Sequence, residues 1–195
     1  MAIAHIIILL AAGILTGFFS GLLGLVGDSI MTPAQDIVYT AMGVPEDMTI
    51  KLAFGTCLLV ILPTAISGAW RHHQKGVVQW KLATVMGSCT LIAAFGGATL
   101  ATHLPGAGLK IAFGIILLAT GIKMLTAQPP EGEQQEFRDN PWLWLAWAIP
   151  IGFATGIMGF GAGILIVPIL VLALGLKMHR AVATSLAIMI FSSIG

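Results

Sequence analysis

The chain has 195 residues, of which 57% are hydrophobic and only 9% are charged, and its formal net charge is +1. Soluble domains carry about 25% charged and about 45–50% apolar residues, so this composition excludes an ordinary soluble protein and indicates a membrane protein. The charge gives no sign of a nucleic-acid partner, and the cysteines, Cys57 and Cys89, form neither a disulfide framework nor a metal-ligand pattern.

The apolar segments predict an all-α, polytopic protein of the lipid bilayer. The first, residues 3–26, has no Lys or Arg and no small-residue cleavage site after its apolar run, so we interpret it as a membrane helix rather than a signal peptide. Segments of spanning length, about 17–25 residues, follow at 52–70, 82–103, 108–126 and 141–160. Shorter apolar segments lie at 29–43 and 163–175, and a last one begins near Ala181.

The two halves of the chain repeat each other. GFFSGLLGLVGDSIMTP, residues 17–33, aligns without a gap with GFATGIMGFGAGILIVP, residues 152–168. Further on, KLAFGTCL at 51–58 aligns with HRAVATSL at 179–186. Two matching blocks of this length favour an internal duplication over a coincidence of composition.

A polar stretch divides the repeats. We expect a first transmembrane repeat at 1–127, a cytoplasmic linker rich in Pro, Gly and charge at 128–141, and a second repeat at 142–195. Counterparts of the helices at 82–103 and 108–126 are absent after the second copy, so we expect that the second repeat is incomplete and that the natural protein is longer.

The basic residues predict how the chain is oriented. The loop from Arg71 to Lys81 contains three Lys or Arg residues and no acid, which places it in the cytoplasm, and the loop at 175–180 is basic as well. Counting spans back from Arg71 places its counterpart, 43–51, outside. The two repeats are therefore predicted to be inverted.

The repeated motif has the pattern of a broken or re-entrant helix. In hydrocarbon, a helix break is tolerated only where it is buried in protein or lines a cavity. The helix that begins after a break directs free N–H groups and a positive dipole end toward that cavity, which favours an anion. Two such breaks in inverted repeats are typical of the central site of a secondary transporter. For Gly17 and Gly21 the alternative is close helix packing.

Both copies resemble the glycine-rich repeat of the sulfite exporter TauE/SafE family, in which a pattern close to G-x-x-x-G-L-x-G-x-G-G-G-x-x-x-x-P is followed by A-x-G-T-S-L. The resemblance covers essentially the whole chain and includes ISGAWRHHQKGVVQW at 66–80. It implies a multi-pass permease of a prokaryotic plasma membrane that moves a small sulfur-containing anion (sulfite, an organosulfonate or sulfoacetate). It also implies coupling to an ion gradient, of protons or sodium, and we include a homo-oligomer among the expected assemblies.

The resemblance assigns candidate substrate-binding residues by position. The glycine motif falls on Gly24, Gly27 and Ser29 in the first copy and on Gly159, Gly161 and Gly163 in the second. The G-T-S positions hold Gly55, Thr56 and Cys57, and Ala183, Thr184 and Ser185. The chain departs from the pattern at Val26, Asp28, Ala162 and Ala183, which replace glycines, and at Cys57, which replaces a serine. The first-half loop is therefore less permissive than the family pattern.

The polar candidates each have a plainer alternative. The hydroxyls of Thr56, Thr184 and Ser185 either donate to an oxyanion or bond back to a carbonyl of their own helix.

Four charged or titratable residues remain. Lys51 and His179, at equivalent positions, either attract an anion or extend to the headgroups. Asp28 either caps the short helix or titrates and couples anion movement to protons. Asp36 is expected to face the bundle interior or water rather than lipid.

These observations favour a secondary transporter that works by alternating access. The alternative is an anion channel that uses the same helix-break site, although no continuous polar run predicts a pore. The chain has no HExxH or Ser–His pattern, so we expect no enzyme, no catalytic residue, no metal site and no cofactor.

Overall fold

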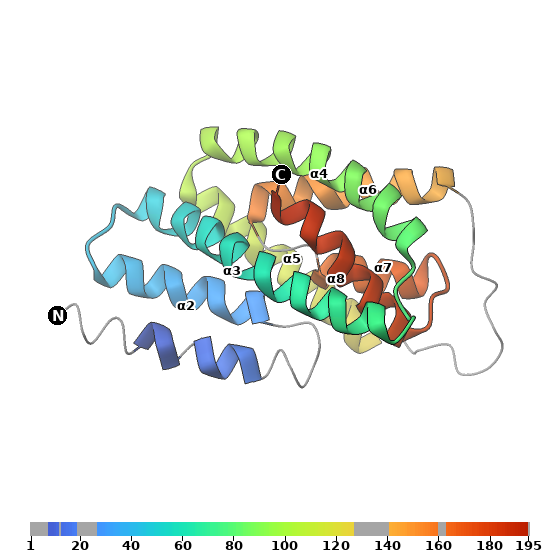
Figure 1. The fold of residues 1–195 in the computed structure, drawn as a ribbon. Coiled ribbons are helices and arrows are strands. Elements are labelled where there is room, and N and C mark those ends of the chain that lie inside the picture. The colour runs from blue at the N-terminus through green and yellow to red at the C-terminus, as the bar shows by residue number, and fades with distance from the viewer. Residues whose placement is uncertain (1–7, 12, 19–26, 127–140, 160–162, 195) are drawn as a thin grey trace.

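The computed structural model describes residues 8–11, 13–18, 27–126, 141–159 and 163–194, without the side chains of 27–30, 124, 125 and 164. Its named elements are all helices (Figure 1): α2 (Gly27–Ala41), α3 (Glu46–Gln74), α4 (Trp80–His103), α5 (Gly106–Thr126), α6 (Pro141–Met158), α7 (Gly163–Leu172) and α8 (Met178–Ile194). Residues 8–11 and 13–18 are helical too. Among the helices that the structure describes, four, α3 to α6, are long and apolar enough to cross a membrane. The all-α polytopic membrane fold is thus confirmed.

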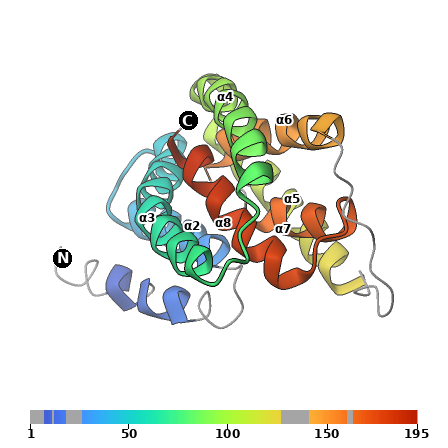
Figure 2. The ribbon, with the colours of Figure 1, turned by 45° about the vertical axis from the view of Figure 1, so that its right-hand side comes forward.

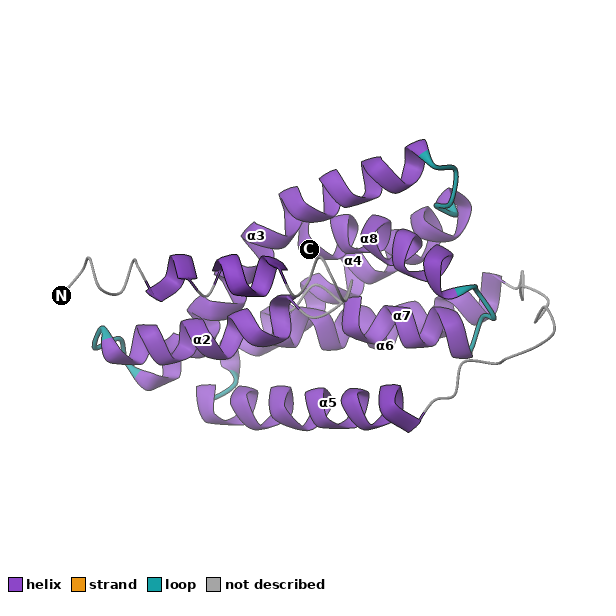
Figure 3. Cartoon of the chain, turned by 90° about the horizontal axis from the view of Figure 1, so that it is seen from below, coloured by secondary structure: helices purple, strands orange, loops and turns teal. Residues whose placement is uncertain are grey.

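The two short helices, α2 and α7, have the lengths expected of half-helices. They contain 15 and 10 residues, which correspond to about 22 and 15 Å, whereas the hydrocarbon core is about 30 Å thick. They begin at Gly27 and Gly163, positions that the repeat alignment places one residue apart. Both helices begin near the middle of the molecule and run toward opposite ends (Figures 1 and 3).

Each short helix packs on the long helix that follows it, α2 on α3 and α7 on α8. The long helices α3 and α8 in turn pack against each other and run in opposite directions (Figure 1). In Figure 2, α4 and α6 form a pair above α3 and α8. Equivalent hairpins that point in opposite directions are the arrangement that inverted repeats require, and this supports the predicted inversion.

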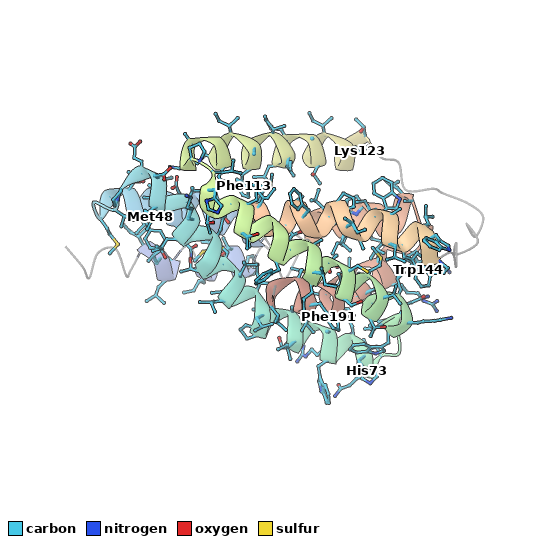
Figure 4. All side chains as sticks on the ribbon, turned by 90° about the horizontal axis from the view of Figure 1, so that it is seen from above. Met48, His73, Phe113, Lys123, Trp144 and Phe191 are labelled. Carbon is cyan, nitrogen blue, oxygen red and sulfur yellow. The ribbon has the colours of Figure 1, made fainter. Side chains whose placement is uncertain are left out.

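The charged residues are divided between the two ends of the molecule. The loops at 75–79 and 173–177 lie at one end, where the rings of His72 and His179 are 5.4 Å apart, and those at 42–45 and 104–105 lie at the other (Figure 1). In Figure 4, His73, Lys123 and Trp144 lie toward the first end and Met48 toward the second. We call them the basic end and the acidic end, since the second holds all acids whose side chains are described: Asp36, Glu46 and Asp47. The segments 43–51 and 71–81 lie at opposite ends, as the predicted inversion requires (Figure 1).

The seam between α4 and α6 is built from small residues. A Cβ atom added to Gly156 would lie 2.0 Å from the carbonyl oxygen of Ala94, and one added to Gly152 would lie 2.6 Å from that of Thr90. The backbones therefore touch, as in close packing of membrane helices. These glycines align with Gly21 and Gly17, for which packing was the alternative; Gly17 has nothing within 4 Å of a Cβ, and Gly21 lies outside the described residues.

Changing Gly156 to Ala is expected to destabilise the protein by about 1–3 kcal/mol, the usual effect of overpacking, because the backbone of α4 cannot rotate away as a side chain can. The measurement is the midpoint of thermal unfolding in detergent. Gly114→Ala is the control, since a Cβ there meets nothing within 4 Å and alanine favours a helix. Equal midpoints for the two variants would contradict the packing described above.

Candidate functional site

A cluster of polar side chains lies buried between α2 and α3. The side-chain oxygen of Gln35 accepts hydrogen bonds from Thr56 Oγ1 at 2.9 Å and from Cys57 Sγ at 3.3 Å. Thr32 Oγ1 lies 3.4 Å from Cys57 Sγ, and the Tyr39 hydroxyl donates to Thr56 Oγ1 at 3.5 Å. Gln35 is 5% exposed and Thr32 is fully buried. We call these five residues the polar cluster.

The cluster follows from the spacing of polar residues on α2. Thr32, Gln35 and Tyr39 are three and four residues apart, so they share one face of the helix. That face meets α3 where Thr56 and Cys57 follow each other. The apolar side chains that continue this contact come from α2, α3 and α8: Met31, Ile61, Ala65, Met189 and Ile190. An amide buried among such groups is unfavourable unless it is hydrogen-bonded, so the cluster is a specific polar site in an apolar bundle.

Thr56 has two competing uses for its single hydroxyl proton. Its Oγ1 lies within hydrogen-bonding distance of the carbonyl oxygens of Leu52 at 2.9 Å and Ala53 at 3.0 Å, as well as of Gln35. A threonine hydroxyl donates once, so these bonds are alternatives. The two interpretations offered by the sequence, bonding back to the helix and donating into a site, are therefore both available. The proton can move between them by rotation of the side chain.

The chemistry of the cluster suits an oxyanion. Hydroxyl groups of Thr32, Tyr39 and Thr56, the two N–H groups of the Gln35 amide and the weak thiol donor of Cys57 are all neutral donors. Several neutral donors around one position match the several acceptor oxygens of a small anion. In the part of the chain that the structure describes, no group of three or more His, Cys, Asp or Glu residues could hold a metal ion.

The second repeat has no equivalent polar cluster among its described residues. If the alignment of the repeats is continued, Gln35 and Tyr39 correspond to Leu170 and Leu174, which are fully buried. The Thr184 hydroxyl oxygen accepts a hydrogen bond from the backbone N–H of Gln79 at 3.2 Å. Ser185 donates to the carbonyl of Val182 at 2.8 Å. Thr184 and Ser185 are thus engaged with backbone and are not brought to the polar cluster.

The helix break of the second repeat is described at Gly159. Helix α6 ends at Met158, and Gly159 has a φ of +57°, in the left-handed region that favours glycine at a helix C-terminus. A Cβ atom added to Gly159 would lie 2.1 Å from Cβ of Phe54. The break therefore lies directly against α3 of the first repeat, and two separate constraints require glycine.

The other glycine-motif positions are described less fully. Gly163 begins α7, where an added Cβ would lie 3.1 Å from Sδ of Met189. Gly27 begins α2, so Asp28 and Ser29 fall in its first turn, although their side chains lie outside the description. Gly24 and Gly161 lie outside the described residues. The short helices expected at 29–43 and 163–175 are present as α2 and α7, whereas the cradle of backbone amides and the coupling role of Asp28 stay predictions.

Three candidates lie away from the cluster. Lys51 donates to the carbonyl oxygen of Thr102 at 3.2 Å and lies 3.7 Å from an Asp47 carboxylate oxygen, at the acidic end. His179 lies at the basic end beside His72. Gly55 is exposed, and nothing lies within 4 Å of an added Cβ. The equivalent positions Lys51 and His179 thus mark opposite ends of the molecule.

The profile of the family described as "Sulfite exporter TauE/SafE" matches residues 8–195. The chain belongs to the TauE/SafE family. It is 30% identical over 190 residues to a probable membrane transporter protein of Methanocaldococcus jannaschii, covering 96% of this chain and 69% of the relative. A probable membrane transporter protein of Xylella fastidiosa strain 9a5c is 31% identical (95% and 70% covered). YunE of Bacillus subtilis, with the same description, is 26% identical (96% and 75%).

No solved structure matches the chain significantly. Together, TauE/SafE membership, these relatives and the apolar helices identify a multi-pass membrane transporter, and not an enzyme.

Proposed function

We propose that this TauE/SafE chain moves a small sulfur-containing anion (sulfite, an organosulfonate or sulfoacetate) across the plasma membrane of a prokaryote by alternating access, and that the polar cluster binds this anion. The observation that carries the proposal is the buried amide of Gln35, whose oxygen accepts hydrogen bonds from Thr56 and Cys57. In the interior of a membrane protein, buried polar groups of this kind mark a substrate pathway. Neutral donors bind an anion without the strong attraction of a fixed cation, which favours release on the other side.

The arrangement of the helices supports alternating access. The hairpins α2–α3 and α7–α8 point in opposite directions and meet along α3 and α8 (Figure 3). Movement of one hairpin against the other along this seam would expose the polar cluster first to one end and then to the other, as in transporters with inverted repeats. Transport coupled to a proton or sodium ion, and assembly as a homo-oligomer, are further parts of the proposal.

Flux measurements on purified protein in liposomes test this function. We expect saturable uptake of sulfite or of an organosulfonate that stops when the gradient of the coupling ion is dissipated, because a transporter exposes its site to one side at a time. Sulfate and a carboxylate such as acetate serve as control anions. A current that persists without a gradient of the coupling ion and rises linearly with voltage would favour the channel instead. Equal flux of the control anions would contradict the proposed substrate class.

A further inference from the structure

An ion pair joins α2 to α5 directly beside the polar cluster. Lys110 Nζ of α5 lies 2.9 Å from Asp36 Oδ2 of α2, and the two side chains are 35% and 18% exposed. Asp36 follows Gln35 in the sequence, and successive residues of a helix are about 100° apart around its axis. The same turn of α2 therefore presents Gln35 to α3 and Asp36 to α5. Asp36 is largely buried against α5, which corresponds to the bundle interior, one of the two placements expected from the sequence.

The ion pair bridges two helices that share little packing of their own. Helix α2 packs on α3, and α5 also packs on α3, through contacts such as the rings of Phe54 and Phe113, whose centroids are 5.7 Å apart. Among the described residues, direct contact between α2 and α5 is slight. Separation of α2 from α5 would therefore disrupt little apart from the Asp36–Lys110 pair.

Asp36 is only half satisfied. Its other carboxylate oxygen, Oδ1, is buried and has no hydrogen-bond partner. A buried carboxylate that lacks part of its hydrogen bonding recovers only part of its desolvation free energy. Asp47, at the same end, is different: one oxygen accepts the backbone N–H of Gly106 and the other lies 3.7 Å from Lys51 Nζ. Asp47 thus uses both of its carboxylate oxygens, whereas the Asp36 carboxylate depends on Lys110 alone.

We propose that the Asp36–Lys110 ion pair is a latch that holds the polar cluster closed toward the acidic end. When the pair breaks, α3 is the one described helix on which α2 still packs substantially, and separation of α2 from α3 then opens the cluster to the side on which the acidic end lies. The latch gives the opening a single direction, because the Asp36–Lys110 pair lies in the half of the molecule toward that end. This inference rests on the proposed function, in that it takes the polar cluster to be the transport site.

The labelling rate of Cys57 tests the latch without any substrate. Cys57 is 2% exposed, so a membrane-impermeant maleimide reaches its thiol only when α2 and α3 separate. In a Cys89→Ala background, labelling is measured from each face in turn, with right-side-out and inverted vesicles. We expect Asp36→Asn and Lys110→Gln to raise the rate about tenfold, which corresponds to about 1.4 kcal/mol, from the face of the acidic end only.

Two further variants serve as controls. Lys110→Arg keeps the positive charge, so Cys57 should be labelled as slowly as in the unmodified background. Glu46→Gln removes an acid at the same end that makes no ion pair in the described structure. If Asp36→Asn fails to fold, the comparison of the Cys57 labelling rates of Lys110→Gln and Lys110→Arg still tests the latch. Unchanged labelling, or labelling that rises equally from both faces, would overturn the latch. A one-sided rise in a protein that shows no flux of sulfur anions would support the latch and contradict the proposed substrate.

Discussion

Gln35→Leu is expected to remove most of the saturable flux of the sulfur-containing anion and to leave the protein folded. Leucine is the residue at the equivalent position of the second repeat, Leu170, and it has a similar size. Without the Gln35 acceptor, the Thr56 hydroxyl keeps a bond to the carbonyl of Leu52 or Ala53, so no strong donor is left buried without a partner. The substitution should therefore weaken binding of the anion and leave the free energy of unfolding nearly unchanged.

The expected size of the effect follows from the hydrogen bonds that the amide would make to a charged ligand. Bonds to charged groups contribute about 1.5–3 kcal/mol each, so flux at low substrate concentration should fall about 10- to 100-fold. Gln74→Leu is the matched control, because Gln74 is exposed at the end of α3. Initial uptake rates in liposomes, together with thermal unfolding of each variant, provide the comparison. Normal uptake by folded Gln35→Leu protein would remove Gln35 from the site.

Gly159→Ala is expected to give the largest loss of stability of any single change considered. A residue with a side chain in the left-handed region is disfavoured by about 1–2 kcal/mol, and the new Cβ would also overlap Phe54. The nearest atoms of Phe54 are its Cβ at 2.1 Å and its Cα at 2.8 Å, so no rotation of the ring relieves the overlap. The break between α6 and α7 would have to move away from α3, and with it the contact between the repeats.

Gly43→Ala separates the two contributions. Gly43 also has a positive φ, of +83°, but an added Cβ there meets nothing within 4 Å. We expect Gly43→Ala to lower the unfolding temperature modestly and Gly159→Ala to yield little folded protein in the membrane. Monodisperse protein after detergent extraction, measured by fluorescence-detected gel filtration, is the readout. Similar yields for the two variants would show that the close contact with Phe54 does not exclude a side chain at position 159.

The helix breaks could be predicted from the sequence because they depend on local chemistry. Gly and Pro within an apolar tract restrict where a helix can continue, and the repeat shows the same restriction twice. The short segments expected at 29–43 and 163–175 correspond to α2 and α7, which differ from those bounds by a few residues. The opposite directions of the hairpins followed from charge, since the basic loops can be counted along the chain.

The polar cluster was only partly predicted, because it depends on the rotation of α3 against α2. Gly55, Thr56 and Cys57 are consecutive, and the motif could not indicate that Gly55 faces outward while the next two residues face Gln35. Gln35 itself was missed. The spacing of Thr32, Gln35 and Tyr39 along the short helix was the available signal, but three polar residues on one face become a site only when α3 supplies Thr56 and Cys57. That contact is tertiary, and the sequence of one helix alone does not indicate it.

Protection of Cys57 by ligand tests directly whether the polar cluster binds a small sulfur-containing anion. In Cys89→Ala protein, maleimide labelling of Cys57 is measured with and without an organosulfonate such as methanesulfonate, because sulfite itself reacts with maleimides. We expect labelling to slow saturably as the organosulfonate is added and not to be slowed by acetate at the same ionic strength. A labelling rate that is independent of every sulfonate tested, in protein that shows saturable sulfonate flux, would place the substrate site elsewhere.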